Sequence, residues 1–316
     1  MSPHEVHQGE HDATNAYRSL SETTAHDDPR WAFGAGVDDG LGLGGAEITA
    51  PLPPGVDAAD LAAYCQMLGD DALVYSHRLS EWVANAPELE EEVALANIAL
   101  DLLGQARVLL SRAGHAEGLV EGREARDEDR LAFFREQSEF RNVALVEQPD
   151  DQDFARCIAG LLLFATWRLA LLHRLRDSAD PVVAAVADKG VKEVTYHRDY
   201  AARWTLRLGD GTEESHRRMQ SAVEWVWPFA EELFRTSEEE RRLVAAGVAV
   251  DPAATRGEVD AVLDQVLTRS TLTRPQVPGT GTIAGRGGRQ GVHTEQLGHV
   301  LDVLQSLARR HEGATW

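Results

Sequence analysis

Five residues stand at positions where a bundle of four helices could hold a pair of iron ions. Such a bundle supplies one Glu from each of two helices and a Glu-x-x-His pair from each of the other two. The spacing matters because residues three apart share one face of a helix. In this sequence the corresponding positions are Asp71, Leu102, Gln105, Glu193 and His197. Leu102 has no donor atom and Gln105 is an amide, so we predict vestigial slots with no catalytic, metal-ligating or cofactor-binding residue.

The carboxylates that would bridge two irons are mostly missing. Asp70 and Asp71 lie at the apolar edge of the first expected helix, but no Asp or Glu occurs between Phe154 and Arg176. Two or three ligands of the required six remain. Because hard iron ions need carboxylates for bridging oxygens and for charge balance, we expect this remnant to bind them poorly.

The surviving polar residues also have structural interpretations. Asn97, Asp101 and Gln105 follow one another at four-residue intervals and could form a hydrogen-bonded stripe. Glu193 could pair with Arg168 or Arg203, with a guanidinium replacing the metal charge. His197, which stands four residues after Glu193 and next to Tyr196, could be an ordinary core histidine.

Four long helices must position these residues. Apolar residues recur at helical spacing in each, Asp57 and Asn85 are candidate N-caps, and Asp180-Pro181 opens the last. Gly114 is the expected stop of the second helix. No alternating strand pattern is present, so we predict an all-α fold. The expected helices are 57–84, 85–114, 153–176 and 180–209.

The second of these helices is apolar on two sides. Because a helix of one small bundle buries only one face, we expect this one to lie inside a larger assembly. One side carries Leu89, Val93, Leu100 and Leu103, and the other carries Leu95, Ile98, Leu102 and Leu109.

The composition divides the chain into a tail, 1–56, and a helical domain, 57–316. The tail lacks an apolar period, so we expect it to be disordered or loosely draped over the domain, and its histidines have no spacing that fixes a metal geometry. The domain comprises a core bundle, 57–209, and accessory helices, 210–316. The expected accessory elements are 212–234 with a kink at Pro228, 237–246, 251–272, a mobile loop 274–291, and 294–310. The tail histidines are His4, His7, His11 and His26.

Charge and cysteine content exclude several classes of function. The net charge of −21 disfavours nucleic acid and anionic membranes as partners. No basic segment precedes an apolar one near the first residue, and the run Cys157–Trp167 is too short to span a bilayer. With only Cys65 and Cys157, both in apolar helical patterns, we expect a reduced cytoplasmic protein without disulfides.

Several longer motifs follow one another along the chain: residues 68–89, 95–107, 145–149, 192–193 with 196–197, and 291–298. In this order they resemble a known family, the C subunits of bacterial phenylacetyl-CoA epoxidase. The similarity runs from about Leu61 to Trp316.

The resemblance implies a ferritin-like long four-helix bundle and a structural, non-catalytic role beside a di-iron A subunit. That subunit would epoxidise the CoA-activated ring and bind most of phenylacetyl-CoA. Further small subunits would join the complex, and a reductase subunit with a flavin and an iron–sulfur cluster would supply electrons from NADPH.

Two alternatives stay open at this point. One is a self-sufficient ferritin-like di-metal oxygenase or iron-binding protein that uses Asp71, Glu193 and His197. The other is a homo-oligomeric acyl-CoA-binding protein that uses Arg286 and Arg289 in the loop, where we otherwise expect both arginines to be solvated.

Overall fold

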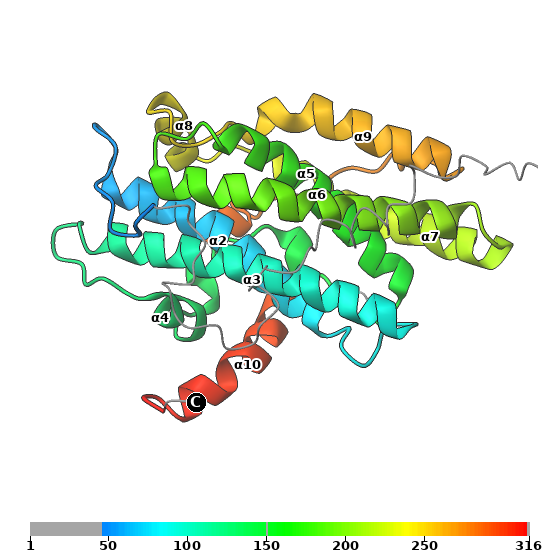
Figure 1. Cartoon of the computed structure of the whole chain (residues 1–316), viewed down its shortest axis with the longest axis horizontal. Coiled ribbons are helices and arrows are strands. Elements are labelled where there is room, and N and C mark those ends of the chain that lie inside the picture. Colours follow the sequence, from blue (N-terminus) through cyan, green and yellow to red (C-terminus); the bar gives the residue numbers. More distant parts are fainter. Residues whose placement is uncertain (1–45, 150, 315–316) are drawn as a thin grey trace, which may run out of the picture. The chain divides into compact units, whose positions relative to one another are not determined.

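The computed structural model describes residues 46–149 and 151–314, and helices dominate this part of the chain (Figure 1). The four long helices are α2 (Ala58–Ser80), α3 (Leu89–Glu117), α5 (Phe154–Leu175) and α6 (Pro181–Gly209). α2 packs on α3, α5 packs on α6, and α3 also contacts α6. This pairing of two helical hairpins is consistent with the expected ferritin-like bundle. The all-α prediction is confirmed, since the described residues contain one isolated bridge, Ile283–Arg286, and no strand.

Shorter elements surround this bundle. α7 packs on α5 and α6, α8 packs on α2, and α10 packs on α4 and α2. In Figure 1, α9 lies along the top of the bundle and α10 projects from the opposite side. The α-helices are α4 (Glu128–Phe133), α7 (Glu213–Val226), α8 (Glu238–Ala245), α9 (Arg256–Arg269) and α10 (Glu295–Arg310). The 3-10 helices are η2 (Gln137–Glu139), η3 (Ala144–Glu147), η4 (Trp227–Phe234), η5 (Pro252–Thr255) and η6 (Gly288–Gln290).

Local sequence signals explain where most helices begin. The Asp57 carboxylate accepts hydrogen bonds from the backbone N–H groups of Ala59 and Asp60, and Asp180 caps α6 with Pro181 in its first turn. Ser237 and Glu240 form the expected capping box of α8. At Pro228 the α-helix gives way to the 3-10 helix η4, because proline has no N–H to continue the α-helical ladder.

The second helix differs from the prediction at both ends. It begins at Leu89, with Glu88 rather than Asn85 at the N-cap, and it continues past Gly114 to Glu117. Gly114 allows a close approach instead of stopping the helix. A Cβ there would lie 1.6 Å from the carbonyl oxygen of Arg126.

The predicted tail lies outside the described residues up to position 45, and its last residues, 46–56, lie against the core. Ile48, Leu52 and Val56 pack against the core, and Arg112 donates hydrogen bonds to the carbonyl oxygens of Ile48 and Ala50. Three separated apolar residues were too few to show a period in the sequence.

The loop 274–291 also differs at its end. Gly288–Gln290 forms η6, and the Arg289 side chain is only 9% exposed. The loop therefore ends in a docked segment, not in a solvated one.

Two helices of the described residues, α3 and α5, are long and apolar enough in composition to cross a membrane. Core helices also meet this criterion, and 89% of the most apolar stretch of α5 is buried in the bundle. For α3 the buried share is 50%, because its second apolar side lies at the surface.

Candidate functional site

A chain of polar contacts links all four long helices at the centre of the bundle. The Arg168 Nε on α5 donates to Gln105 Oε1 on α3 at 3.0 Å, and the Gln105 Nε2 donates to Glu193 Oε2 on α6 at 2.9 Å. The Arg168 guanidinium also donates to the carbonyl oxygen of Leu68 on α2, at 3.3 and 3.4 Å. Thus Gln105 and Glu193, two of the predicted slots, lie together, with a buried arginine beside them.

The expected pairing of Glu193 with Arg168 is therefore indirect. Gln105 stands between the two side chains, while Lys189 lies 3.5 Å from Glu193. Burial lowers the pKa of Arg168 to about 10, since desolvation penalises the charged form. This value is still well above neutral pH, so the guanidinium keeps its charge inside the bundle.

His197 and Asp101 form a second contact between α3 and α6. The Nε2 atom of His197 lies 3.0 Å from the Asp101 carboxylate, and the His197 side chain is 1% exposed. Asn97 is exposed, and Gln105 bonds to other helices. The residues of the polar stripe expected along α3 therefore do not bond to one another. Asp101 and Gln105 instead bond to the neighbouring helices α5 and α6.

Asp71 is fully buried and is bound by an arginine from the far end of the chain. Arg289 donates to both carboxylate oxygens, at 3.0 and 2.8 Å, and the backbone N–H of Val143 donates to one of them at 2.9 Å. Burial opposes the charge of Arg289, but Asp71 and Glu240 outweigh it and raise the pKa of the guanidinium. The expectation of a solvated Arg289 is wrong, because this side chain closes a buried ion pair.

Asp70 has a similar partner. It accepts two hydrogen bonds from the buried Arg135 and one, at 2.8 Å, from the backbone N–H of Arg141. Arg286, the other candidate for binding the phosphates of CoA, donates to the Gln290 carbonyl oxygen. A basic groove for the nucleotide is therefore not formed by Arg286 and Arg289 together.

The side chains at the predicted slots do not fit a di-iron centre. Asp71 gives both oxygens to Arg289, α5 contributes Arg168 in place of a carboxylate, and Leu102 is a fully buried apolar side chain. Within residues 46–149 and 151–314, no three His, Cys, Asp or Glu side chains are grouped closely enough to hold a metal ion. The central interactions of the bundle are instead salt bridges and hydrogen bonds.

A third polar cluster joins two motifs far apart in the sequence. Both oxygens of the buried Glu147 carboxylate have partners: His293 Nδ1 at 2.7 Å, and the backbone N–H and hydroxyl of Thr294 at 2.8 and 2.6 Å. The other ring nitrogen of His293 lies 3.0 Å from the Phe140 carbonyl oxygen. Through these two contacts the His293 ring links Glu147 to the backbone at Phe140.

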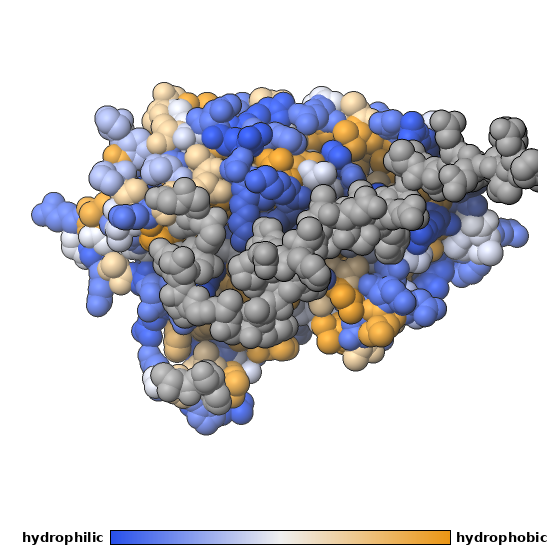
Figure 2. All heavy atoms as spheres, in the orientation of Figure 1, coloured by the Kyte–Doolittle hydropathy of each residue, from blue (hydrophilic) through white to orange (hydrophobic). Residues whose placement is uncertain are grey.

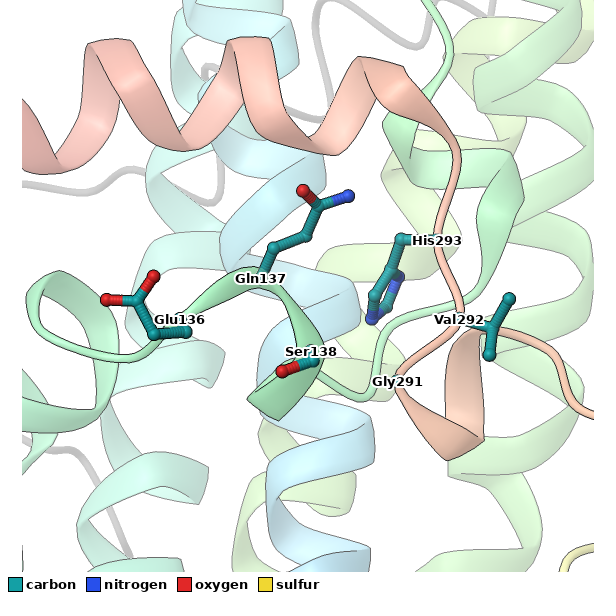
Figure 3. A pocket seen from close by; sticks show the side chains of 6 residues that line it. All are labelled: Glu136, Gln137, Ser138, Gly291, Val292 and His293. Carbon is teal, nitrogen blue, oxygen red and sulfur yellow. The ribbon is translucent and has the colours of Figure 1, made fainter.

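An open hollow of about 460 Å³ lies beside this cluster (Figure 3). In Figure 3 the His293 ring lies between the turn at Gln137 and Ser138 and the segment that leads into α10. The cluster anchors the segment that leads into α10. The sequence alone did not show that the motif of Glu147 and the motif of His293 lie side by side. The hollow is lined by Glu136, Gln137, Ser138, Gly291, Val292 and His293.

The chain is similar to known proteins over most of its length. Residues 52–316 match the family described as phenylacetic acid catabolic protein. The chain is also similar to the C subunit of the 1,2-phenylacetyl-CoA epoxidase of Escherichia coli (strain K12). The two are 44% identical over 256 residues, which cover 81% of this chain and 99% of the relative. The chain therefore belongs to the phenylacetic acid catabolic protein family.

Proposed function

We propose that this chain is a structural, non-catalytic subunit of a 1,2-phenylacetyl-CoA epoxidase. It supports a catalytic subunit that holds the di-iron centre and binds most of the acyl-CoA substrate. Electrons from NADPH reach that centre through a separate reductase with a flavin and an iron–sulfur cluster, and the complex works in the cytoplasm. The similarity to the C subunit of an epoxidase supports the pathway and a multisubunit assembly.

One observation carries the non-catalytic role: the contact chain from Arg168 through Gln105 to Glu193. A di-iron site needs anionic oxygen ligands around its positive charge. Here the centre already holds a cation that bonds to α2 and α3, and Asp71 is neutralised by Arg289. The interior thus holds guanidinium groups where an iron pair would need anionic oxygens.

The test is iron content, measured on the chain alone and in complex with its catalytic partner. We expect far less than one iron per chain after anaerobic loading with Fe(II) and gel filtration of the isolated chain. We expect iron and epoxidation only when the catalytic subunit is present. Stoichiometric iron in the isolated chain, lost in Glu193→Ala but retained in the surface variant Glu258→Ala, would support the self-sufficient di-metal enzyme instead.

A second arm tests the supporting role. Coproduction with the catalytic subunit is expected to give one complex with higher activity than the catalytic subunit alone. Elution as two independent species at moderate salt, with no change in activity, contradicts the proposal.

A further inference from the structure

α3 carries a row of apolar residues on the side that faces away from the bundle, which we call the outer row. Its members are Leu89, Val93, Ala96, Leu100 and Leu103. The four large side chains are 70%, 52%, 61% and 44% exposed, in that order. On the opposite side of the same helix Leu95, Ile98 and Leu102 are fully buried. The core is therefore complete without the outer row.

The spacing of the outer row indicates what kind of element would cover it. Its residues follow one another at intervals of four, three, four and three, which is the heptad pattern of a coiled-coil seam. A seam of this kind packs against another long helix at a shallow crossing angle, because the 3.5-residue period keeps it facing one partner helix. At about 1.5 Å per residue the row is roughly 20 Å long, or about four turns.

The backbone near one end of the row is accessible for close packing. A Cβ built on Gly104, next to Leu103, would meet no atom within 4 Å, and Ala96 adds only a methyl group at the middle. Small residues of this kind let two helices approach closely. On α6, the neighbour of α3, Tyr196 is 46% exposed. Figure 2 shows hydrophobic residues gathered where the N-terminal part of α3 lies in Figure 1.

Charges differ between the two ends of the row. The first turn of α3 carries Glu90, Glu91 and Glu92, whereas Arg107 is exposed beyond Leu103. A partner helix with basic residues near the first turn and an acidic residue near Arg107 would be complementary. The pattern therefore predicts the charge at each end of the partner helix as well as its apolar seam.

We propose that the outer row of α3 is the docking surface for a long helix of another subunit of the epoxidase. This inference rests on the proposed function and adds the surface through which the chain acts. Another subunit is favoured over a second copy of this chain, because each copy carries a net charge of −21 and two copies would repel one another. The relative is named as one lettered subunit of its epoxidase, which also implies further, different subunits.

The first experiment measures complex formation with the catalytic subunit for Leu100→Glu. Leu100 is 61% exposed, so the fold should persist, which circular dichroism verifies. A charge in the middle of a buried helical seam should weaken binding by at least about 30-fold, the size of an interface hot spot. The matched control is Val303→Glu, at a residue of α10 that is 68% exposed. It should bind like the unmodified chain.

The outcomes separate the two proposals. If the unmodified chain forms no complex, the proposed function fails. If the unmodified chain binds but Leu100→Glu binds equally well, or only Val303→Glu weakens binding, the function stands and the docking surface is wrong.

A thiol introduced at the same position identifies the occupant. Cys65 and Cys157 are both buried, so Leu100→Cys would carry the one accessible thiol of the described residues. A thiol-to-amine cross-linker should join it to a helix of the catalytic subunit, while the unmodified chain gives no product through a thiol. A cross-link to a second copy alone, with the catalytic subunit present, would overturn the proposal.

Discussion

Removal of the Arg289 guanidinium should strongly destabilise the protein, although this residue lies in a segment without a long helix. The Asp71 side chain is 0% exposed and that of Arg289 is 8% exposed. Arg289→Met leaves the carboxylate buried with only the Val143 N–H as donor. It also removes the donor to the carbonyl oxygens of Met67 and Arg141, at 3.0 and 2.8 Å. Breaking one side of a buried ion pair costs about 3–5 kcal/mol, and we expect a loss of this size.

Asp71→Asn separates the charge effect from the loss of packing. In the double variant, Asp71→Asn with Arg289→Met, neither member of the pair carries a charge. The double variant should therefore be more stable than the sum of the two single effects predicts, by about 2–3 kcal/mol.

Urea unfolding of the unmodified chain, the two single variants and the double variant at one pH, followed by circular dichroism, gives this coupling energy. Arg286→Met is the matched control, because Arg286 is exposed and its side chain donates to the carbonyl oxygen of Gln290, close by in the sequence. Its effect should stay within about 0.5 kcal/mol. Additive effects at Asp71 and Arg289, or a loss below about 1 kcal/mol for Arg289→Met, would refute the interpretation that this pair holds η6 to α2.

Three further predictions concern the described core. First, Gly114→Ala should destabilise the protein by about 2–3 kcal/mol, because the added methyl group would collide with the Arg126 carbonyl oxygen. The control Gly104→Ala has open space around it and should be neutral or stabilising by up to about 1 kcal/mol. Thermal unfolding compares the stability of the two variants. Second, burial raises the pKa of Glu232 above its ordinary 4.5, so between that value and the folded-state pKa the folded chain binds more protons than the unfolded chain. Stability should fall there as pH rises, and urea unfolding across pH should show a smaller slope for Glu232→Gln. Third, His293→Ala should speed amide hydrogen exchange in α10, because Glu147 loses a buried partner. The control His299→Ala changes an exposed residue of α10 and should leave the exchange rate as it is. Equal exchange rates in the two variants would contradict the conclusion that His293 anchors the segment before α10.

Local signals predicted the helices well because they act over one or two turns. Asp57, the Asp180-Pro181 pair and the Ser237–Glu240 box each satisfy backbone groups within three residues, so the sequence alone identifies them. The helix end predicted at Gly114 failed because the reason for that glycine is a contact with Arg126, twelve residues away, that leaves no local pattern.

Charge pairing could not be predicted in the same way. Asp71 and Arg289 are 218 positions apart, and Arg289 stands in a glycine-rich segment that looked solvated. The partner of a buried charge is set by tertiary packing, which the spacing of residues along the chain does not contain. The sequence showed that Leu102 and the third helix supply no carboxylate, but not which cations lie in the interior of the bundle.

The buried arginine at the centre of the bundle has a mechanical consequence. A metal in such a bundle cross-links the helices that supply its ligands. Here Arg168 on α5 bonds to α2 and α3, and Gln105 extends the link to α6, so one buried cation joins the same four helices. Because these bonds hold the inner side of α3 through side chains of the chain itself, we expect the bundle to keep its shape when iron is withheld. The outer row on the same helix is then presented in a fixed position, as a rigid docking surface requires.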